Sequence, residues 1–416
     1  MATVELPRVA RIRQRFAQEH IVDVGAAVRD ALRSSDVATR VRPGARIAVT
    51  AGSRGISQVP AIVEATVAAL RAHGADPFIV PAMGSHGGAT AEGQREVLKG
   101  YGVTEAAVGA PICATMDVVE IGQTGRGVPV LMDRYAYEAD GVLICGRVKA
   151  HTAFKAPIES GLCKMLSVGL AKQRGAEAMH AAGLAETIPE AASVALATGK
   201  VVLGLAIVEN AADDPYRIVA VPPDRFQAAD RELLQVSNAL LPRIPFEHLH
   251  VLVVDWIGKN ISGSGMDPNV IGMWRRLGGE RKPDYRRIVV RDVTPESHGN
   301  AIGIGWADFT TRRLVDAIDY PAMYMNCLTA NAPDVARIPM TMASDREAIE
   351  AAVKTSAAGG SVRLARVHST LRLEELFVSE ALLDEVAQHP ALEVLEPPAP
   401  LQFDAEGRLG PPFVTK

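Results

Sequence analysis

A short unit of strand, glycine-rich turn and helix occurs twice near the start of the chain, and it limits the fold more than any other feature. In the first copy an apolar run at 46–50 leads into the motif GSRG at 52–55 and then into an amphipathic pattern at 59–72. In the second copy a run at 76–80 leads into GSHGG at 84–88. The two motifs begin 32 residues apart, at 52 and 84, which is about the length of one βαβ unit. Such units have parallel strands, so the sequence predicts an α/β fold.

Further apolar runs extend this pattern along the chain, at 141–145, 201–208, 251–255 and 287–291. Continuous apolar runs of this kind are typical of parallel strands that are buried on both faces. The proline-containing segment Leu241-Pro-Arg-Ile-Pro245 has the composition of a linker. A chain of 416 residues is also long enough for two or three domains.

We therefore expect two α/β domains with mainly parallel sheets. The first is predicted over 1–242 and the second over 246–395, with a tail at 396–416 that packs back on the first domain. Because domain junctions are favoured ligand sites, the active site is expected in a cleft between the two domains.

The composition excludes several classes of protein. The chain has 44 basic and 48 acidic residues, a net charge of −4, and no basic stripe of the kind that nucleic-acid binders carry. Its apolar runs are too short to cross a membrane, and its N-terminus lacks the apolar core of a secretion signal. The four cysteines form no CxxC motif, which favours reduced thiols in a cytoplasmic protein.

Polar side chains stand among glycines where the predicted strands end. They are Arg54, His86, the pair Lys149 and His151, and Lys259. Ligands of open α/β sheets bind outside the carboxyl ends of the strands. Cationic side chains there suit an anionic substrate, and histidines suit proton transfer near neutral pH. The sequence therefore predicts an enzyme site for a small anionic molecule.

The segment 146–180 holds two residues that allow more than one interpretation. Lys164 lies among apolar residues, so it either extends its amine to solvent or is desolvated for covalent chemistry. His180 follows sixteen residues later and, with His86 and His151, could supply three ligands of a zinc-type hydrolase. No HxH or HExxH spacing relates His86, His151 and His180, so the signal for zinc is weak. The chain also lacks the GxGxxG motif of dinucleotide-binding folds and the P-loop motif GxxxxGK[ST].

Taken in order, these motifs resemble the nickel-dependent lactate racemase family of 2-hydroxy acid racemases and epimerases. The resemblance runs from about residue 45 to at least 310. It rests on GSRG at 52–55, GSHGG at 84–88, Lys149-Ala-His151, Gly161-Leu-Cys-Lys164, Gly175-Ala-Glu-Ala-Met-His180 and the segment 258–269.

The resemblance implies a cofactor and a set of roles. The family uses a nickel-pincer nucleotide (pyridinium-3-thioamide-5-thiocarboxylic acid mononucleotide with Ni), which separate cofactor-synthesis enzymes make. By resemblance, Lys164 attaches the cofactor, His180 binds the metal, His86 and His151 are the acid–base catalysts, and Arg54 and Lys259 bind the substrate. The implied reaction inverts the α-carbon of a 2-hydroxy acid by reversible hydride transfer.

One departure from the family concerns the substrate. Lactate racemase has a glutamine three residues before the substrate-site lysine, and this chain has Trp256 there. A bulky side chain at that position alters the pocket, so malate, a sugar acid or an aryl hydroxy acid is as good a candidate as lactate. A zinc-type hydrolase, or a non-catalytic homologue that binds a nucleotide or anion, remains the alternative.

Overall fold

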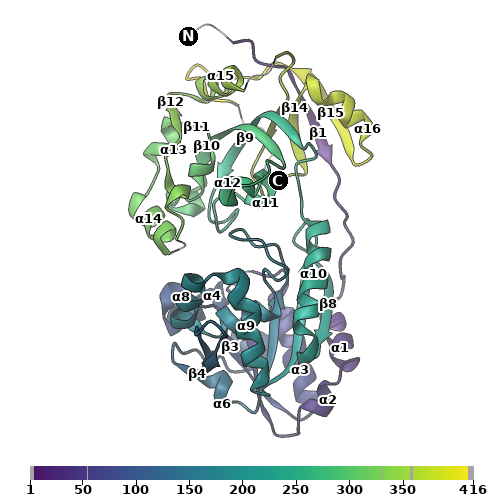
Figure 1. The fold of residues 1–416 in the computed structure, drawn as a ribbon. Helices are drawn as coiled ribbons and strands as arrows, with labels where there is room; N and C mark the ends of the chain where they lie inside the picture. Colours follow the sequence, from purple (N-terminus) through teal and green to yellow (C-terminus); the bar gives the residue numbers. More distant parts are fainter. Residues whose placement is uncertain (1–3, 54, 330, 357–358, 411–416) are drawn as a thin grey trace. The chain divides into compact units, whose positions relative to one another are not determined.

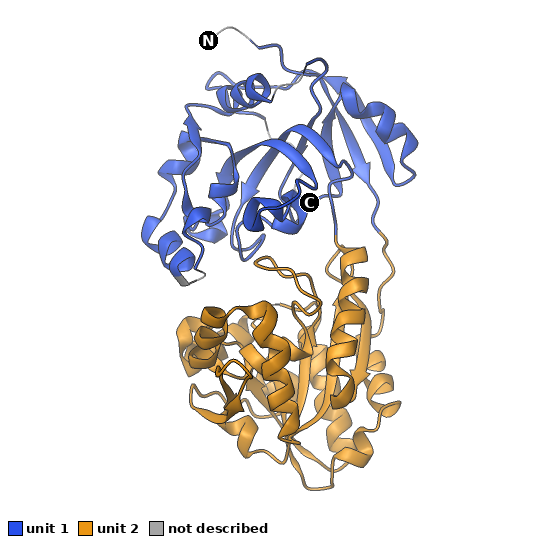
Figure 2. Ribbon diagram, viewed as in Figure 1, with its two compact units in different colours: residues 1–16, 242–416 blue, residues 17–241 orange. Residues whose placement is uncertain are grey.

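The chain folds into two compact units, here described from a computed structural model that covers residues 4–53, 55–329, 331–356 and 359–410. One unit consists of Ala17–Leu241, and the other combines residues 1–16 with 242–416 (Figure 2). The boundary between Leu241 and Pro242 falls within the predicted linker. The expected range 1–242 is wrong for the first sixteen residues, which belong to the unit formed by the C-terminal half.

The unit Ala17–Leu241 is built on a five-stranded sheet with the strand order β3-β2-β6-β7-β8 (Figure 1). The pairs β3–β2, β2–β6 and β6–β7 are parallel, and only β8 is antiparallel to its neighbour. The strands are β2 (Arg46–Ala51), β3 (Asp76–Pro81), β6 (Gly141–Arg147), β7 (Val201–Glu209) and β8 (Pro215–Val221), with a separate hairpin of β4 (Val118–Gln123) and β5 (Pro129–Asp133). The repeated unit of the sequence thus forms adjacent parallel strands, as predicted.

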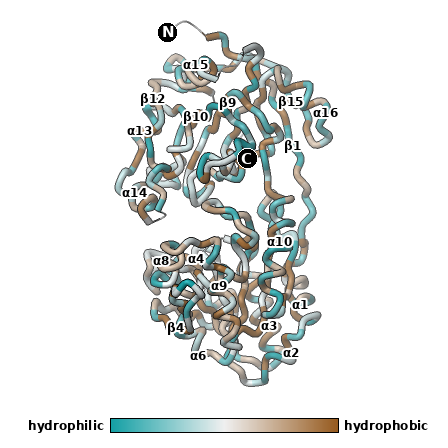
Figure 3. The backbone as a smooth tube through the Cα atoms, in the orientation of Figure 1, coloured by the Kyte–Doolittle hydropathy of each residue, from teal (hydrophilic) through white to brown (hydrophobic). Residues whose placement is uncertain are grey.

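Helices cover both faces of this sheet and enclose two apolar cores. Helices α1, α3 and α4 pack on one face, and α7 to α10 pack on the other. Figure 3 shows the apolar stretches gathered in the middle of this unit. The helical elements are α1 (Val24–Arg33), α2 (Val37–Arg40), α3 (Val59–Ala72), η1 (Gly87–Ala89), α4 (Ala91–Gly100), α5 (Glu105–Val108), α6 (Arg134–Glu138), α7 (Leu162–Lys164), the π-helix η2 (Met165–Gly169), α8 (Lys172–Ala182), α9 (Leu184–Ala197), η3 (Pro223–Arg225) and α10 (Phe226–Leu240).

The second unit has an eight-stranded mixed sheet with the order β12-β11-β10-β9-β13-β14-β1-β15. It is parallel from β12 to β13 and antiparallel from β13 to β15. The strands are β1 (Val9–Gln14), β9 (His248–Ile257), β10 (Asp284–Val293), β11 (Phe309–Thr311), β12 (Met340–Met342), β13 (Leu364–Val367), β14 (Glu375–Ser379) and β15 (Leu392–Ala399). The helical elements are α11 (Pro268–Ile271), α12 (Trp274–Leu277), η4 (Pro295–Ser297), η5 (Ile304–Trp306), α13 (Arg312–Asp316), α14 (Tyr320–Thr329), η6 (Pro333–Ala336), α15 (Asp345–Thr355), η7 (Glu380–Leu382) and α16 (Leu383–Gln388).

Strand β1 explains why the N-terminus belongs to this second unit. It lies between β14 and β15 and pairs with both in antiparallel register. Its Arg11 also forms ion pairs with Glu375 of β14 at 2.6 Å and with Glu396 of β15 at 2.8 Å. The first residues of the chain therefore complete a sheet whose other strands come from the second half.

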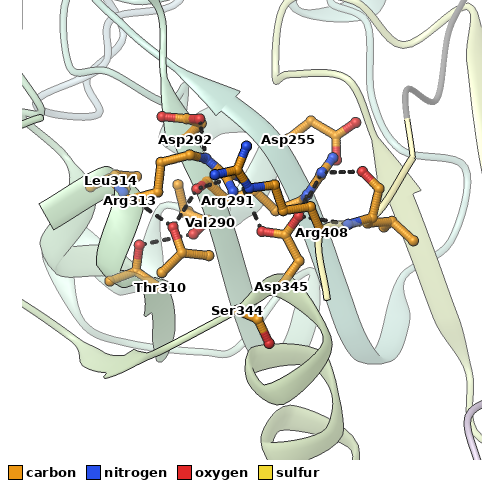
Figure 4. A network of polar contacts seen from close by, with 12 residues as sticks. Asp255, Val290, Arg291, Asp292, Thr310, Arg313, Leu314, Ser344, Asp345 and Arg408 are labelled. Atoms are coloured by element: carbon orange, nitrogen blue, oxygen red, sulfur yellow. Dashed lines mark hydrogen bonds and ion pairs between the residues drawn. The ribbon is translucent and has the colours of Figure 1, made fainter. Parts of the chain in front are cut away.

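A buried charged cluster fixes the C-terminal segment to the same unit (Figure 4). Arg291 contacts Asp255 and Asp345, both at 2.7 Å, and Arg366 contacts Asp255 at 2.9 Å. The two arginines also donate to the carbonyls of Leu409 and Gly410, at 2.6 and 2.9 Å. The described part of the tail, 396–410, thus packs on the second unit, because its carbonyls accept hydrogen bonds from these buried guanidinium groups. The expectation that the tail returns to the first domain is wrong for these residues.

Among the described residues, no helix has the length and apolar character needed to cross a membrane.

Candidate active site

The carboxyl ends of β3, β2 and β6 lie along one edge of the first sheet, because these strands are adjacent and parallel. Each strand is followed there by one of the polar segments that the sequence analysis singled out. The segments contain GSRG after β2, GSHGG after β3, and Lys149 and His151 after β6. Arg54 itself lies outside the described residues.

The ring of His86 is oriented by the backbone just before it. Its Nδ1 lies 2.9 Å from the carbonyl oxygen of Met83. Since a carbonyl only accepts hydrogen bonds, Nδ1 carries the proton in the neutral ring, and Nε2 is the nitrogen that takes up a further proton. The side chain is exposed, so this nitrogen is placed to act as a base.

His151 is held in the opposite way. Its Nδ1 accepts a hydrogen bond from the backbone N–H of Ala153 at 3.0 Å. In the neutral ring the proton therefore resides on Nε2, which acts as a hydrogen-bond donor. The backbone N–H of His151 donates to the buried carboxylate of Glu159 at 2.6 Å, and the ring packs against Phe154 with centroids 4.6 Å apart. The two neutral rings are therefore opposite tautomers: Nε2 is an acceptor in His86 and a donor in His151.

Lys164 ends the short helix α7 and is followed at once by the π-helix η2. π-Helical turns are rare and occur frequently at functional sites. The buried carboxylate of Asp230, on α10, accepts hydrogen bonds from the backbone N–H groups of Leu162 and Cys163, at 3.0 and 2.8 Å. Asp230 therefore fixes the start of the helix that carries Lys164.

Burial shapes the ionisation of the groups around Lys164. It raises the pKa of Asp230 to about 6, although the two backbone donors oppose this shift. It also raises the pKa of the Cys163 thiol far above its usual range, so this thiol is neutral at physiological pH. Cys163 is consequently a core residue and not a nucleophile.

His180 lies on the exposed side of α8, within its last turn. Its Nδ1 is 2.6 Å from the carbonyl oxygen of Ala176. This contact places the proton of the neutral ring on Nδ1 and leaves the Nε2 lone pair as the possible metal donor. Metal-binding histidines commonly have this arrangement, in which the second ring nitrogen donates to a carbonyl.

Close backbone packing brings these segments together. The N–H of Gly84 donates to the carbonyl of Gly169 at 3.0 Å. A Cβ on Gly84 would lie 3.3 Å from the Cβ of Ala176, one helical turn before His180. Cβ atoms on Gly52 and Gly146 would lie 3.6 and 2.8 Å from side-chain atoms of Met165, the residue after Lys164. The strand-end segments around residues 52, 84 and 146 therefore all contact the stretch 165–176.

Two predicted substrate residues belong to the other unit. Trp256 is half-buried on β9, where it pairs with Asp292 of β10. Lys259 is exposed in the loop that follows, and its ammonium donates to the carbonyl of Gly263 at 2.8 Å. Both lie at the carboxyl end of a parallel strand, which is where the sequence analysis placed them.

The three histidines do not form the three-ligand cluster that a zinc-type hydrolase requires. Across the part of the chain that the structure describes, no three His, Cys, Asp or Glu side chains gather closely enough to bind a metal ion.

Sequence reasoning missed the buried residues that hold the backbone around these side chains. Asp230 is the clearest case, because it lies on the buried stripe of α10 together with Phe226, Leu233 and Leu234. A carboxylate on an apolar helix face signals a buried partner. The buried residues Gln94 and Lys172 were missed as well.

Comparison with known proteins gives two positive findings. Residues 4–191 match the family model for the lactate racemase N-terminal domain. The chain is also similar to the solved structure of the lactate racemase apoprotein from Thermoanaerobacterium thermosaccharolyticum, with a TM-score of 0.53 and 11% identity over 88% of this chain and 99% of that one. At this identity the structural likeness shows a shared fold. No curated protein sequence matches the chain.

Proposed function

We propose that the chain is a racemase or epimerase of a 2-hydroxy acid, because residues 4–191 match the family model for the lactate racemase N-terminal domain. The observation that carries the proposal is that two histidines at one sheet edge have opposite tautomers. His86 offers Nε2 as a proton acceptor, and His151 offers Nε2–H as a donor. Inverting an α-hydroxy carbon through a planar 2-keto acid requires the hydroxyl to lose its proton and the resulting carbonyl oxygen to regain one, so a proton acceptor and a proton donor are both needed.

The residues present fit the nickel-pincer nucleotide of the family. Lys164 would hold it covalently through its amine, and His180 would bind the nickel through Nε2, the nitrogen that its contact with Ala176 leaves as the donor. When bound, such a cofactor supplies an electron-poor ring that takes the hydride from carbon 2 and returns it. Nickel suits imidazole ligands, so the donor type agrees with the metal.

The chain itself supplies proton transfer and orientation. In one direction the Nε2 of His86 removes the hydroxyl proton while His151 donates a hydrogen bond to the substrate from the other side. For His151 to act as the acid, it must first gain a proton on Nδ1, which breaks the hydrogen bond from Ala153. The two directions of the reaction therefore begin from different hydrogen-bonding states.

Substrate recognition is proposed to use residues of both units. Arg54 and Lys259 would bind the carboxylate of the substrate, since cationic side chains suit that group. The indole of Trp256 would fill the space of the amide found in lactate racemase, which favours a substrate other than lactate. Malate, a sugar acid and an aryl hydroxy acid are the candidates to compare.

The decisive experiment combines intact mass and activity. The protein is produced together with cofactor-synthesis enzymes, and the wild type and Lys164→Ala are compared by mass and by racemisation of the hydroxy acid panel. We expect a nucleotide adduct and racemisation in the wild type and neither in the variant. An unmodified wild type that racemises no acid on the panel would contradict the proposal and favour a non-catalytic homologue.

Variants of the two histidines test the proposed roles separately. His86→Ala and His151→Ala should each slow both directions of the reaction, by about 10² to 10⁴. Adduct formation should stay at the wild-type level, since neither residue holds the cofactor. A variant that loses only the adduct would assign that histidine to the cofactor.

A further inference from the structure

A lysine is completely buried beneath the candidate site. Lys172, the first residue of α8, is 0% exposed, and its ammonium lies 3.0 Å from the carboxylate of Asp133, which is also 0% exposed. The same ammonium donates to the carbonyl of Pro81 at 2.5 Å and to Oε1 of Gln94 at 3.1 Å. Lys172 therefore joins the ends of β3 and β5 to helix α4.

This arrangement is unfavourable for stability alone. Burial lowers the pKa of Lys172, and Asp133 opposes that shift. Buried ion pairs seldom contribute more stability than apolar residues of the same volume would. Lys172 also has a φ of 54°, a left-handed conformation that costs energy for a residue with a side chain. Strained residues of this kind cluster at functional sites.

Gln94 transmits the position of Lys172 to the loop that carries His86. Because the ammonium of Lys172 only donates, it fixes Oε1 of Gln94 as the acceptor and directs the amide N–H₂ the other way. That group donates to the carbonyls of Gly84 at 3.0 Å and His86 at 3.4 Å. Gln94 is 0% exposed, so water does not compete for these contacts.

The same loop is held close to α4 by two glycines. A Cβ on Gly93 would lie 1.8 Å from the carbonyl oxygen of Gly87, and one on Gly87 would lie 2.5 Å from the carbonyl carbon of Gly93. The backbone directly after His86 is thus pressed against the helix that carries Gln94.

We propose that Lys172 is a positioning residue for His86. Through Gln94 it holds the backbone of residues 84–86, and that backbone directs the ring whose Nδ1 donates to Met83. Through its own backbone it also begins the helix that carries His180. The consequence for proton transfer rests on the proposed function, whereas the consequence for the loop does not.

Gln94→Glu is the sharpest test, because a carboxylate at this position still accepts from Lys172 but no longer donates to the loop. A second variant, Lys172→Met with Asp133→Asn, removes both buried charges and keeps a side chain that can cap α6. The matched control is Arg366→Met, which removes a buried cation paired with Asp255 in the other unit. Hydrogen exchange is measured for a peptide covering 83–90, with a peptide from α10 as the internal reference.

We expect exchange in 83–90 to become about tenfold faster in both test variants and to stay unchanged in the control. In cofactor-loaded enzyme, kcat should fall about tenfold or more with KM nearly constant, because the loop orients a proton acceptor. Wild-type exchange in 83–90 for the test variants, or equal acceleration in the control, would overturn the positioning role. If the wild type racemises nothing, the proposed function fails, and the exchange result still decides the role of Lys172.

Discussion

Gly161 lies directly against the carboxylate of Asp230: a Cβ at Gly161 would be only 2.2 Å from Oδ1. The backbone of Gly161 also has a φ of 119°, which side chains disfavour. This close approach lets Asp230 accept from two backbone N–H groups at the start of α7. A glycine three residues before Lys164 is thus a requirement of the packing around that lysine.

Gly161→Ala should therefore displace α7. We expect the free energy of unfolding of the unit 17–241 to fall by about 2 kcal/mol or more, because the methyl group overlaps a buried carboxylate. The adduct at Lys164 should also be reduced in intact-mass spectra. Gly199→Ala is a useful control, because Gly199 has a positive φ but open space around the Cβ position. Equal adduct levels in the two variants would contradict a link between Gly161 and Lys164.

Asp230 should make the stability of its unit depend on pH. Its pKa in the folded protein is raised to about 6 by burial, from an ordinary 3.8, so folding favours the protonated carboxyl. That contribution is complete below the ordinary pKa and is lost as pH rises through about 6. Between pH 7 and pH 5 the wild type should gain about 1 kcal/mol of stability relative to Asp230→Asn. If the free energies of unfolding of the two proteins change equally between pH 5 and pH 7, Asp230 does not titrate in that range.

The tautomers of the histidines can be measured directly. Nitrogen-15 NMR of the uncharged rings should find the proton on Nδ1 in His86 and His180 and on Nε2 in His151. The reason is that carbonyls accept from the first two, whereas a backbone N–H donates to the third. Substitutions to alanine assign each signal. The same tautomer in His86 and His151 would remove the main support for their division of roles.

Lys164 and His180 should affect the cofactor differently. Lys164→Ala is expected to abolish the covalent adduct, since no other group can replace its amine in the linkage. His180→Ala should keep the adduct and lower the nickel content, because water can partly replace one metal ligand. Mass spectrometry and nickel analysis of both variants, produced with the cofactor-synthesis enzymes, check this. A wild-type nickel content in His180→Ala would assign the metal to another residue.

The C-terminal segment should be necessary for the stability of the second unit. Deleting 401–416 removes the carbonyls of Leu409 and Gly410 from Arg291 and Arg366, so two buried guanidinium groups lose acceptors. We expect a loss of about 3 kcal/mol or more, measured as a lower Tm for that unit. Deleting only 411–416 keeps these contacts and should leave the Tm nearly unchanged. A similar Tm after both deletions would show that the cluster does not depend on the tail.

Local patterns predicted much of the first sheet. The helix expected over 59–72 occurs as α3 (Val59–Ala72), and the run at 76–80 forms most of β3. Thr90, of a residue type that favours helix N-caps, caps α4 by accepting a hydrogen bond from the N–H of Gly93. These features depend on periodicity and on single residues close in sequence, which is the information that a sequence displays.

Long-range pairing was beyond such patterns. β1 is a short alternating segment, and nothing near it in sequence indicates that its partners are β14 and β15, more than 350 positions later. The cluster around Arg291 likewise depends on charges from four separate segments, those of Asp255, Arg291, Asp345 and Arg366. In the candidate site, residues such as His86 and His151 could be selected because histidines among glycines at strand ends suggest a reaction. Lys172 and Gln94 resemble ordinary surface residues until their burial is known.

The unit 17–241 interrupts the other one, so synthesis on the ribosome completes it first. Strand β1 emerges early, but β14 is made only after some 360 further residues, which takes about 20 to 70 s at ordinary elongation rates. During that time β1 has two unpaired edges and no sheet to join. A nascent chain therefore carries an exposed strand ahead of an already folded body, and this interval is when aggregation or capture by a chaperone would occur.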